Sequence, residues 1–174
     1  MSGTFAFRIS DIEAEEIEPM VEEYNKVPEE VSEYFERFAE LVNSLKELDE
    51  IKEECSQGNW EGMGELPITE NTVAKARGLL FKAARMPINI QLPSLTPTTS
   101  GWIEMEWYKE KGHRFAIRLN DQGVFIYSGL LGVGKDFNGN EVEKDTRGRS
   151  ILTDEAFPHA IKDNLSRLFN IPIA

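Results

Sequence analysis

The longest regular pattern of apolar positions in the chain lies between Pro28 and Ser56. This segment opens with a proline suited to a first helical turn, contains no further proline or glycine, and closes before Gly58. We therefore predict one helix, about 40 Å long at 1.5 Å per residue. Its apolar stripe, with spacings of three and four broken only at Lys52, comprises Val31, Tyr34, Phe38, Leu41, Leu45, Leu48 and Cys55. Such a stripe packs either on its own domain or against a helix of another molecule.

Three further segments have helical patterns. A shorter helix is predicted from Asp11 to Tyr24, with Pro19 disturbing its middle. A second begins at the N-cap residue Thr69 and ends before Pro87, with its apolar face formed by Val73, Ala76, Leu79, Leu80 and Ala84. The last begins near Thr153 or Pro158 and is expected to bury Phe157, Ile161, Leu165, Leu168 and Phe169.

Alternating apolar positions predict strands between these helices. A short edge strand is expected at Ile88, Ile90 and Leu92, before a loop over residues 93–100. Three strands then follow as an antiparallel meander, at Trp102–Tyr108, His113–Leu119 and Val124–Ser128. The glycine-rich tract from Gly129 to Asn140 is interpreted as a connection, with a two-residue turn at Asn138 and Gly139. The predicted class is α+β, with a sheet of three to five strands and helices on one face.

Charge divides the chain more sharply than hydrophobicity does. Residues 1–57 contain 17 acidic and five basic residues, whereas residues 58–174 contain 14 of each, so the net charge of −12 belongs to the first third. We therefore predict an acidic helical arm over 1–57 and an α+β core domain over 58–174. The single cysteine, Cys55, and the lack of a signal-peptide pattern or a long apolar run favour a cytoplasmic protein without a membrane-spanning segment.

Candidate chemistry is sparse. The spacing of Gly129, Gly134 and Lys135 resembles a phosphate-binding loop, but Asp136 stands where a hydroxyl residue is needed, and no helix start follows. The segment from Asp136 also fails as a calcium loop, because Glu141 and Arg147 occupy its two most constrained positions. His113 and His159 have no metal-ligand spacing, so neither a metal nor a cofactor is predicted.

One strand does place polar and aromatic residues together. Trp102, Glu104, Glu106 and Tyr108 alternate along the strand and therefore share a face. Paired carboxylates beside aromatic rings could act on a sugar or form a binding patch, and they are equally typical of a solvated sheet face.

Two short segments carry a resemblance. One is the W-x-G-x-G-x-x-P-I sequence from Trp60 to Ile68, and the other is the G-x-I-x-x-E-W sequence from Gly101 to Trp107, with Thr72–Ala76 between them. Together they resemble a group of small bacterial proteins of unknown function over about residues 58–132. The resemblance implies a bacterial or phage origin and transfers no site residue.

These patterns favour a non-enzymatic module that binds another protein, or a second copy, through its N-terminal helices. A sharper form is a charge mimic, such as an inhibitor or antitoxin-like regulator of a nucleic-acid-binding partner, because closely spaced carboxylates can occupy a basic groove. Direct binding of nucleic acid is not expected, since no basic stripe with aromatic residues is present. The alternative is a small enzyme or ligand-binding domain using the face of Trp102, Glu104, Glu106 and Tyr108.

Overall fold

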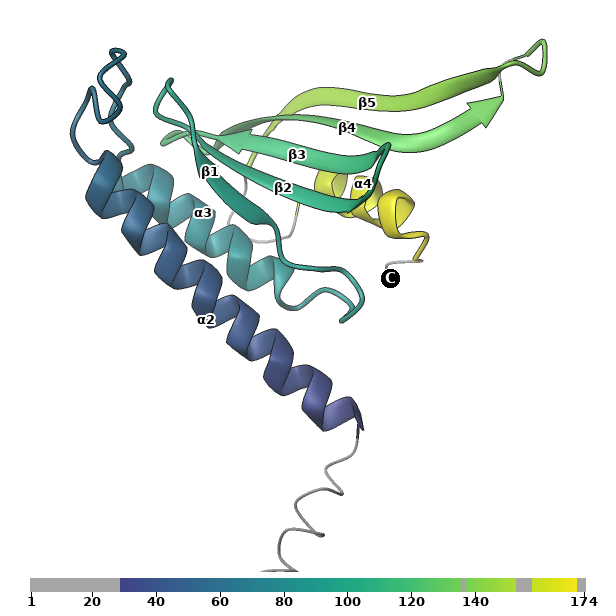
Figure 1. Ribbon diagram of the computed structural model, residues 1–174, viewed down its shortest axis with the longest axis horizontal. Coiled ribbons are helices and arrows are strands. Elements are labelled where there is room, and N and C mark those ends of the chain that lie inside the picture. Colours follow the sequence, from purple (N-terminus) through teal and green to yellow (C-terminus); the bar gives the residue numbers. More distant parts are fainter. Residues whose placement is uncertain (1–28, 136, 153–157, 172–174) are drawn as a thin grey trace, which may run out of the picture. The chain divides into compact units, whose positions relative to one another are not determined.

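The computed structural model of the 174-residue chain describes residues 29–135, 137–152 and 158–171 (Figure 1). Its contacts divide the chain into two units, Met1–Glu36 and Arg37–Ala174. The helix predicted over Asp11–Tyr24 lies outside the described residues.

Five strands form one antiparallel sheet in the second unit, in the order in which they occur along the chain. They are β1 (Ser94–Pro97), β2 (Ile103–Glu110), β3 (His113–Leu119), β4 (Val124–Lys135) and β5 (Glu141–Ile151). Each strand pairs with its neighbour in sequence, so the sheet is a meander. The predicted α+β class with an antiparallel meander is confirmed.

Three helices are present among the described residues, namely α2 (Glu29–Cys55), α3 (Glu70–Ala83) and α4 (His159–Phe169). The predicted bounds of the long helix are confirmed to within a residue at each end. Thr69 caps α3 as predicted, because its Oγ1 accepts a hydrogen bond of 3.2 Å from the backbone N–H of Thr72. The last helix starts after Pro158, one of its two predicted starts, while Thr153 and Phe157 lie outside the described residues.

The core lies between one face of the sheet and the helices α3 and α4 (Figure 1). Alternate residues of β2 and β3 point into it, and the register sets them opposite one another as Ile103 and Leu119, Met105 and Ile117, and Trp107 and Phe115. All six side chains are at most 1% exposed. Because side chains alternate along a strand, the residues between them face away from the helices.

The C-terminal part of α2 belongs to this core. Its Leu41, Leu48, Ile51 and Cys55 are buried with residues of α3 and the sheet. Lys52 Nζ lies 2.5 Å from Glu70 Oε1, and Arg37 Nη2 donates to the carbonyl of Ala83 over 3.0 Å. The compact unit that begins at Arg37 therefore includes the part of the long helix that carries these residues.

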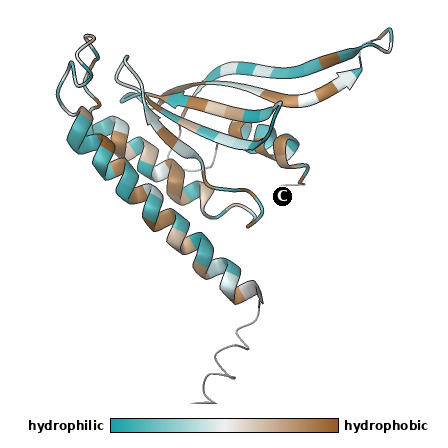
Figure 2. Ribbon diagram, in the orientation of Figure 1, coloured by the Kyte–Doolittle hydropathy of each residue, from teal (hydrophilic) through white to brown (hydrophobic). Residues whose placement is uncertain are grey.

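The predicted stripe consequently has two environments. Leu41 and Leu48 are buried and Leu45 is half-buried, whereas Val31, Tyr34 and Phe38 are exposed. Figure 2 shows hydrophobic and hydrophilic residues alternating along α2.

The predicted strand at Ile88, Ile90 and Leu92 is wrong. These residues belong to a connecting loop in which Ile90 is fully buried, so the alternation reflects a loop that points one side chain into the core. The edge strand is β1, within the segment expected to be a loop, where Leu95 pairs with Met105. Its proline lies at an edge, where a missing N–H is tolerated.

The glycine-rich tract and the charged segment after it form a long hairpin. β4 continues through the glycines to Lys135, and the charged residues form β5, for which no strand was predicted. The predicted two-residue turn at Asn138 and Gly139 is wrong, because β4 and β5 remain paired only as far as Lys135 and Glu141, which leaves five residues between the paired ends. Gly139 has a φ of +83°, but Asn138 lacks the positive φ that a two-residue turn of this kind needs at both positions. Both faces of β5 carry polar residues, so its sequence lacks the apolar alternation that identifies a strand.

Candidate functional site

The sheet face turned away from the helices carries the predicted site residues of β2. Ile103, Met105 and Trp107 point into the core, so the alternate residues Glu104, Glu106 and Tyr108 point outward. Trp102 immediately precedes the strand. Glu104 and Glu106 are half-buried, whereas Tyr108 is 56% exposed.

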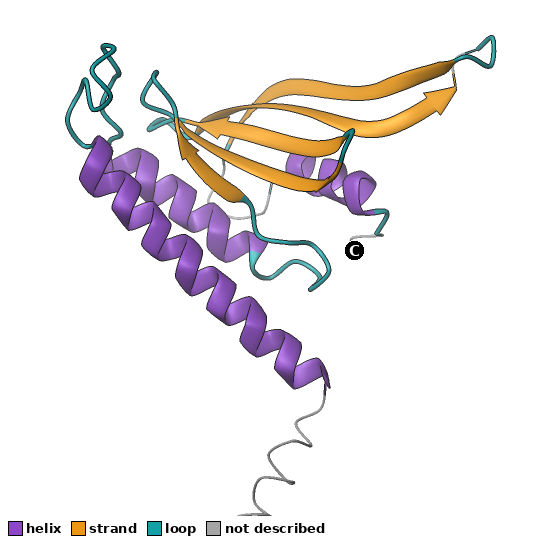
Figure 3. Cartoon of the chain, viewed as in Figure 1, coloured by secondary structure: helices purple, strands orange, loops and turns teal. Residues whose placement is uncertain are grey.

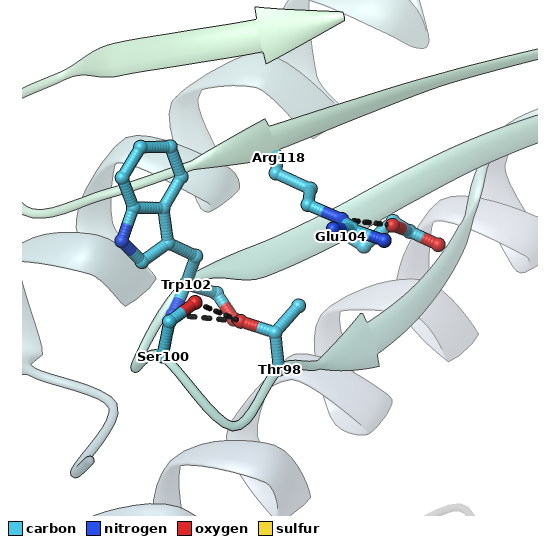
Figure 4. Close-up of polar contacts among 5 residues, drawn as sticks. All are labelled: Thr98, Ser100, Trp102, Glu104 and Arg118. Atoms are coloured by element: carbon cyan, nitrogen blue, oxygen red, sulfur yellow. Dashed lines mark hydrogen bonds and ion pairs between the residues drawn. The ribbon is translucent and has the colours of Figure 1, made fainter. Parts of the chain in front are cut away.

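The strand register adds arginines to this face. Arg118 of β3 lies opposite Glu104, and its Nε donates to Glu104 Oε2 over 2.5 Å (Figure 4). Arg114 lies opposite Tyr108, on the other side of Ala116. The two carboxylates therefore face a strand that carries two guanidinium groups, and Glu104 is held by one of them.

A hollow of about 410 Å³ lies on this face. Its middle is made by Ala116 and Ser128, which are directly opposed on β3 and β4, and Arg147 of β5 lies opposite Ser128. The hollow exists because short side chains at its centre are surrounded by long charged ones. Its lining comprises Glu104, Glu106, Arg114, Ala116, Arg118, Ser128, Gly129, Leu130, Asp145, Thr146 and Arg147.

The charges of the lining are balanced, with three carboxylates and three guanidinium groups. Two opposite pairs are already formed, between Arg118 and Glu104 and, over 2.6 Å, between Arg147 and Asp145. Of the four predicted residues, only Glu104 and Glu106 line the hollow; Trp102 and Tyr108 do not. Trp102 is instead fixed through its backbone, since its N–H donates to Thr98 Oγ1 over 3.1 Å beside Ser100 (Figure 4).

A second polar feature, which the sequence did not reveal, is Glu65 in the loop after α2. Its side chain is 3% exposed, and Oε2 accepts hydrogen bonds of 3.2 Å from the backbone N–H groups of Glu61 and Met63. Its Oε1 has no hydrogen-bond partner in the described part of the chain. Burial alone would raise the pKa of this carboxyl, but backbone N–H groups of the loop together hold the pKa below its usual value.

The loop that contains Glu65 lies in the first of the two segments Trp60–Ile68 and Gly101–Trp107, and it packs against the start of the second. The backbone N–H of Leu66 donates to Thr99 O over 2.9 Å. Gly101 has a φ of +75°, and a Cβ there would lie 2.8 Å from the carbonyl oxygen of Pro67. Close backbone packing therefore explains why a glycine begins the second segment. Trp60 is half-buried against the core.

The remaining sequence candidates have structural roles. Gly129, Gly134 and Lys135 lie within β4, so this tract is strand rather than a loop leading into a helix. Cys55 is 2% exposed, and burial, followed by Glu54 and Glu61, raises the pKa of its thiol. In the described ranges, no group of three or more His, Cys, Asp or Glu residues is arranged to hold a metal ion.

The helices that the structure describes include none that is long and apolar enough to cross a membrane. Comparison of the chain with protein-family models, with curated proteins and with solved structures gave no match.

Proposed function

We propose that this chain is a non-enzymatic protein-protein interaction module whose contact surface includes the exposed apolar residues of α2. The observation that carries the proposal is the exposure of Tyr34 at 71%, Phe35 at 68% and Phe38 at 64%. Phe38 lies three residues after Phe35 and four after Tyr34, and these two spacings bring side chains to neighbouring positions on a helix. Aromatic residues are enriched at protein interfaces, where they supply much of the binding free energy.

The charge of α2 selects the kind of partner. The helix contains ten acidic and three basic residues, and one of the basic residues, Arg37, is buried. Copies of such a helix repel one another, whereas a basic surface attracts it. We therefore propose a basic protein as the partner. An inhibitor or antitoxin-like regulator of a nucleic-acid-binding protein is the sharper form of this proposal, in a cytoplasmic protein of bacterial or phage origin.

The test uses the full chain, because a deletion of residues 1–57 would also remove buried core residues such as Leu48. A photo-reactive phenylalanine analogue is placed at Phe35 in one sample and at Tyr108, an aromatic position on the sheet that is 56% exposed, in the control. Cross-linked products from bacterial lysate are identified by mass spectrometry, at low salt and at about 1 M salt, where exposed charges are screened beyond about 3 Å.

Basic proteins captured at position 35 but not at position 108 support the proposal when they are lost at high salt. They must also be lost when Tyr34→Ser and Phe38→Ser are introduced beside the probe. The same products at both positions, acidic products, or products unaffected by these changes would contradict it.

The hollow on the outer sheet face favours a second candidate, a ligand-binding domain or small enzyme. Arginines at its walls suit a carboxylate or phosphate group, and Glu106 suits a hydroxyl or amino group. Calorimetric titration with a panel of amino acids and sugar phosphates tests this candidate. Loss of binding in Glu106→Gln and in Arg114→Gln, with binding retained in the control Arg167→Gln on α4, supports a ligand site in the hollow. Binding that is unchanged by Glu106→Gln and Arg114→Gln argues against such a site.

A further inference from the structure

The last strand, β5, forms an edge of the sheet. It pairs with β4 on one side, and no described strand pairs with its other side (Figure 3). With 11 residues it is much longer than β1 at the opposite edge, which has four. An edge of this length presents a row of backbone N–H and C=O groups that another strand can satisfy.

The edge is regular along its length. The irregularity in the hairpin lies on β4, where Leu131 and Gly132 stand between the pairs Leu130–Asp145 and Val133–Glu143. Only Lys144 lies between those positions on β5, so the additional residue belongs to the inner strand. β5 therefore stays extended, in the form needed for pairing with a further strand.

The charges on one face of β5 change sign at its midpoint, while the remaining charged residue of the strand, Lys144, lies on the other face. Glu141, Glu143 and Asp145 precede Thr146, while Arg147 and Arg149 follow it. Because these charged residues are two positions apart, they share the outer face of the sheet. Much of β5 is hydrophilic, as Figure 2 shows, and each of these charged residues is exposed.

We propose that two copies of the chain associate by antiparallel pairing of their β5 strands about Thr146. In this register Glu143 lies opposite Arg149 of the second copy, and Asp145 lies opposite Arg147 of the second copy. Symmetry repeats both pairs, and the backbone groups of both edges gain partners. The two five-stranded sheets become one sheet of ten strands, with the helices of both copies on the same side.

The charges select this register over its neighbours. A relative shift of the two strands by two residues keeps the charged side chains on the same face and moves the symmetry axis to Asp145 or to Arg147. Two like charges then lie opposite one another at the axis. Parallel pairing in register opposes like charges throughout. Opposite charges directly across a strand pair are stabilising and like charges are destabilising. The observed contact between Arg147 and Asp145 becomes part of a ring of four alternating charges in the dimer.

Charge exchange tests the proposal with the full chain. An acidic variant carries Arg147→Glu and Arg149→Glu, and a basic variant carries Glu143→Arg and Asp145→Arg. Each should be monomeric alone, because its paired edges would carry one sign of charge. An equimolar mixture should form a one-to-one dimer, since every opposed pair is then complementary. A chain with all four substitutions should dimerise like the wild type.

The measurement is sedimentation velocity over a wide concentration range, with circular dichroism to verify folding of each variant. The control variant carries Lys109→Glu and Lys111→Glu, which make the same change in charge at exposed positions away from the β5 edge and outside the hollow, and it should remain dimeric. A monomeric wild type, a dimeric acidic variant, or a mixture that stays monomeric would each overturn the proposal. It stands apart from the function proposed for α2, because Tyr34→Ser with Phe38→Ser should leave this dimer intact; loss of the dimer in that variant would also overturn it.

Discussion

Replacement of Leu48 by alanine measures how firmly the long helix α2 belongs to the core. Leu48 is fully buried, together with Ile51 and Cys55 on the same helix. Leucine-to-alanine changes at such sites cost about 2–5 kcal/mol, because apolar contacts are lost and a cavity remains. For a domain of this size, about 3 kcal/mol corresponds to a decrease of roughly 6–12 °C in the melting temperature.

The control is Phe38→Ala, which truncates a larger side chain on the same helix at a position that is 64% exposed. Substitutions at exposed positions usually change stability by no more than about 0.5 kcal/mol. Urea unfolding gives the free energy of each variant, with unchanged m values showing that both unfold the same structure. Equal and small losses in the two variants would refute the assignment of Leu48 to the core and would make α2 a separable arm.

Three further substitutions test local features. Gly101→Ala should lower the free energy of unfolding in urea by more than Gly112→Ala, because both glycines have positive φ but only a Cβ at residue 101 would meet a backbone carbonyl. Equal decreases in the two variants would contradict a close contact at Gly101. Glu65→Gln should destabilise the protein at neutral pH, and the difference from wild type should shrink as pH falls below about 4.5 through the depressed pKa of Glu65; a pH-independent difference would contradict the role of the charge. Gly148→Ala should be destabilising because Tyr127 covers that glycine, and a double-mutant cycle with Tyr127→Ala should recover part of the loss; strict additivity would count against this packing.

The elements that could be predicted from the sequence are those with one buried face. The apolar spacing of α3 and the alternation of β2 and β3 reflect burial on one side, and the structure has these elements where they were expected. β5 has polar residues on both faces, so no periodicity marked it, although its position in the sheet gives it the longest exposed edge. Loop residues such as Ile90 can imitate a strand when one side chain fills a gap in the core.

The candidate site could be predicted only in part. Alternation along one strand was enough to bring Glu104 and Glu106 to the same face. That Arg118 lies opposite Glu104 depends on the pairing register of β2 and β3. A shift of the register by two residues would keep the same side chains on each face, so the apolar alternation alone does not determine which polar residues are opposed. Glu65 was missed for a different reason: its partners are backbone N–H groups, which every residue possesses, so no side-chain pattern could identify them.

The hydrogen bond from Leu66 to Thr99 also orders events during translation. The loop after α2 cannot be completed until residue 99 has emerged, which takes on the order of a few seconds after residue 66 at about 5–20 residues per second. During that interval Leu48 and its neighbours on α2 also lack the β-strands that later complete their core. A nascent chain of this protein therefore passes through a stage in which an amphipathic helix is synthesised but uncovered, and this is the stage at which a chaperone has the most apolar surface to bind.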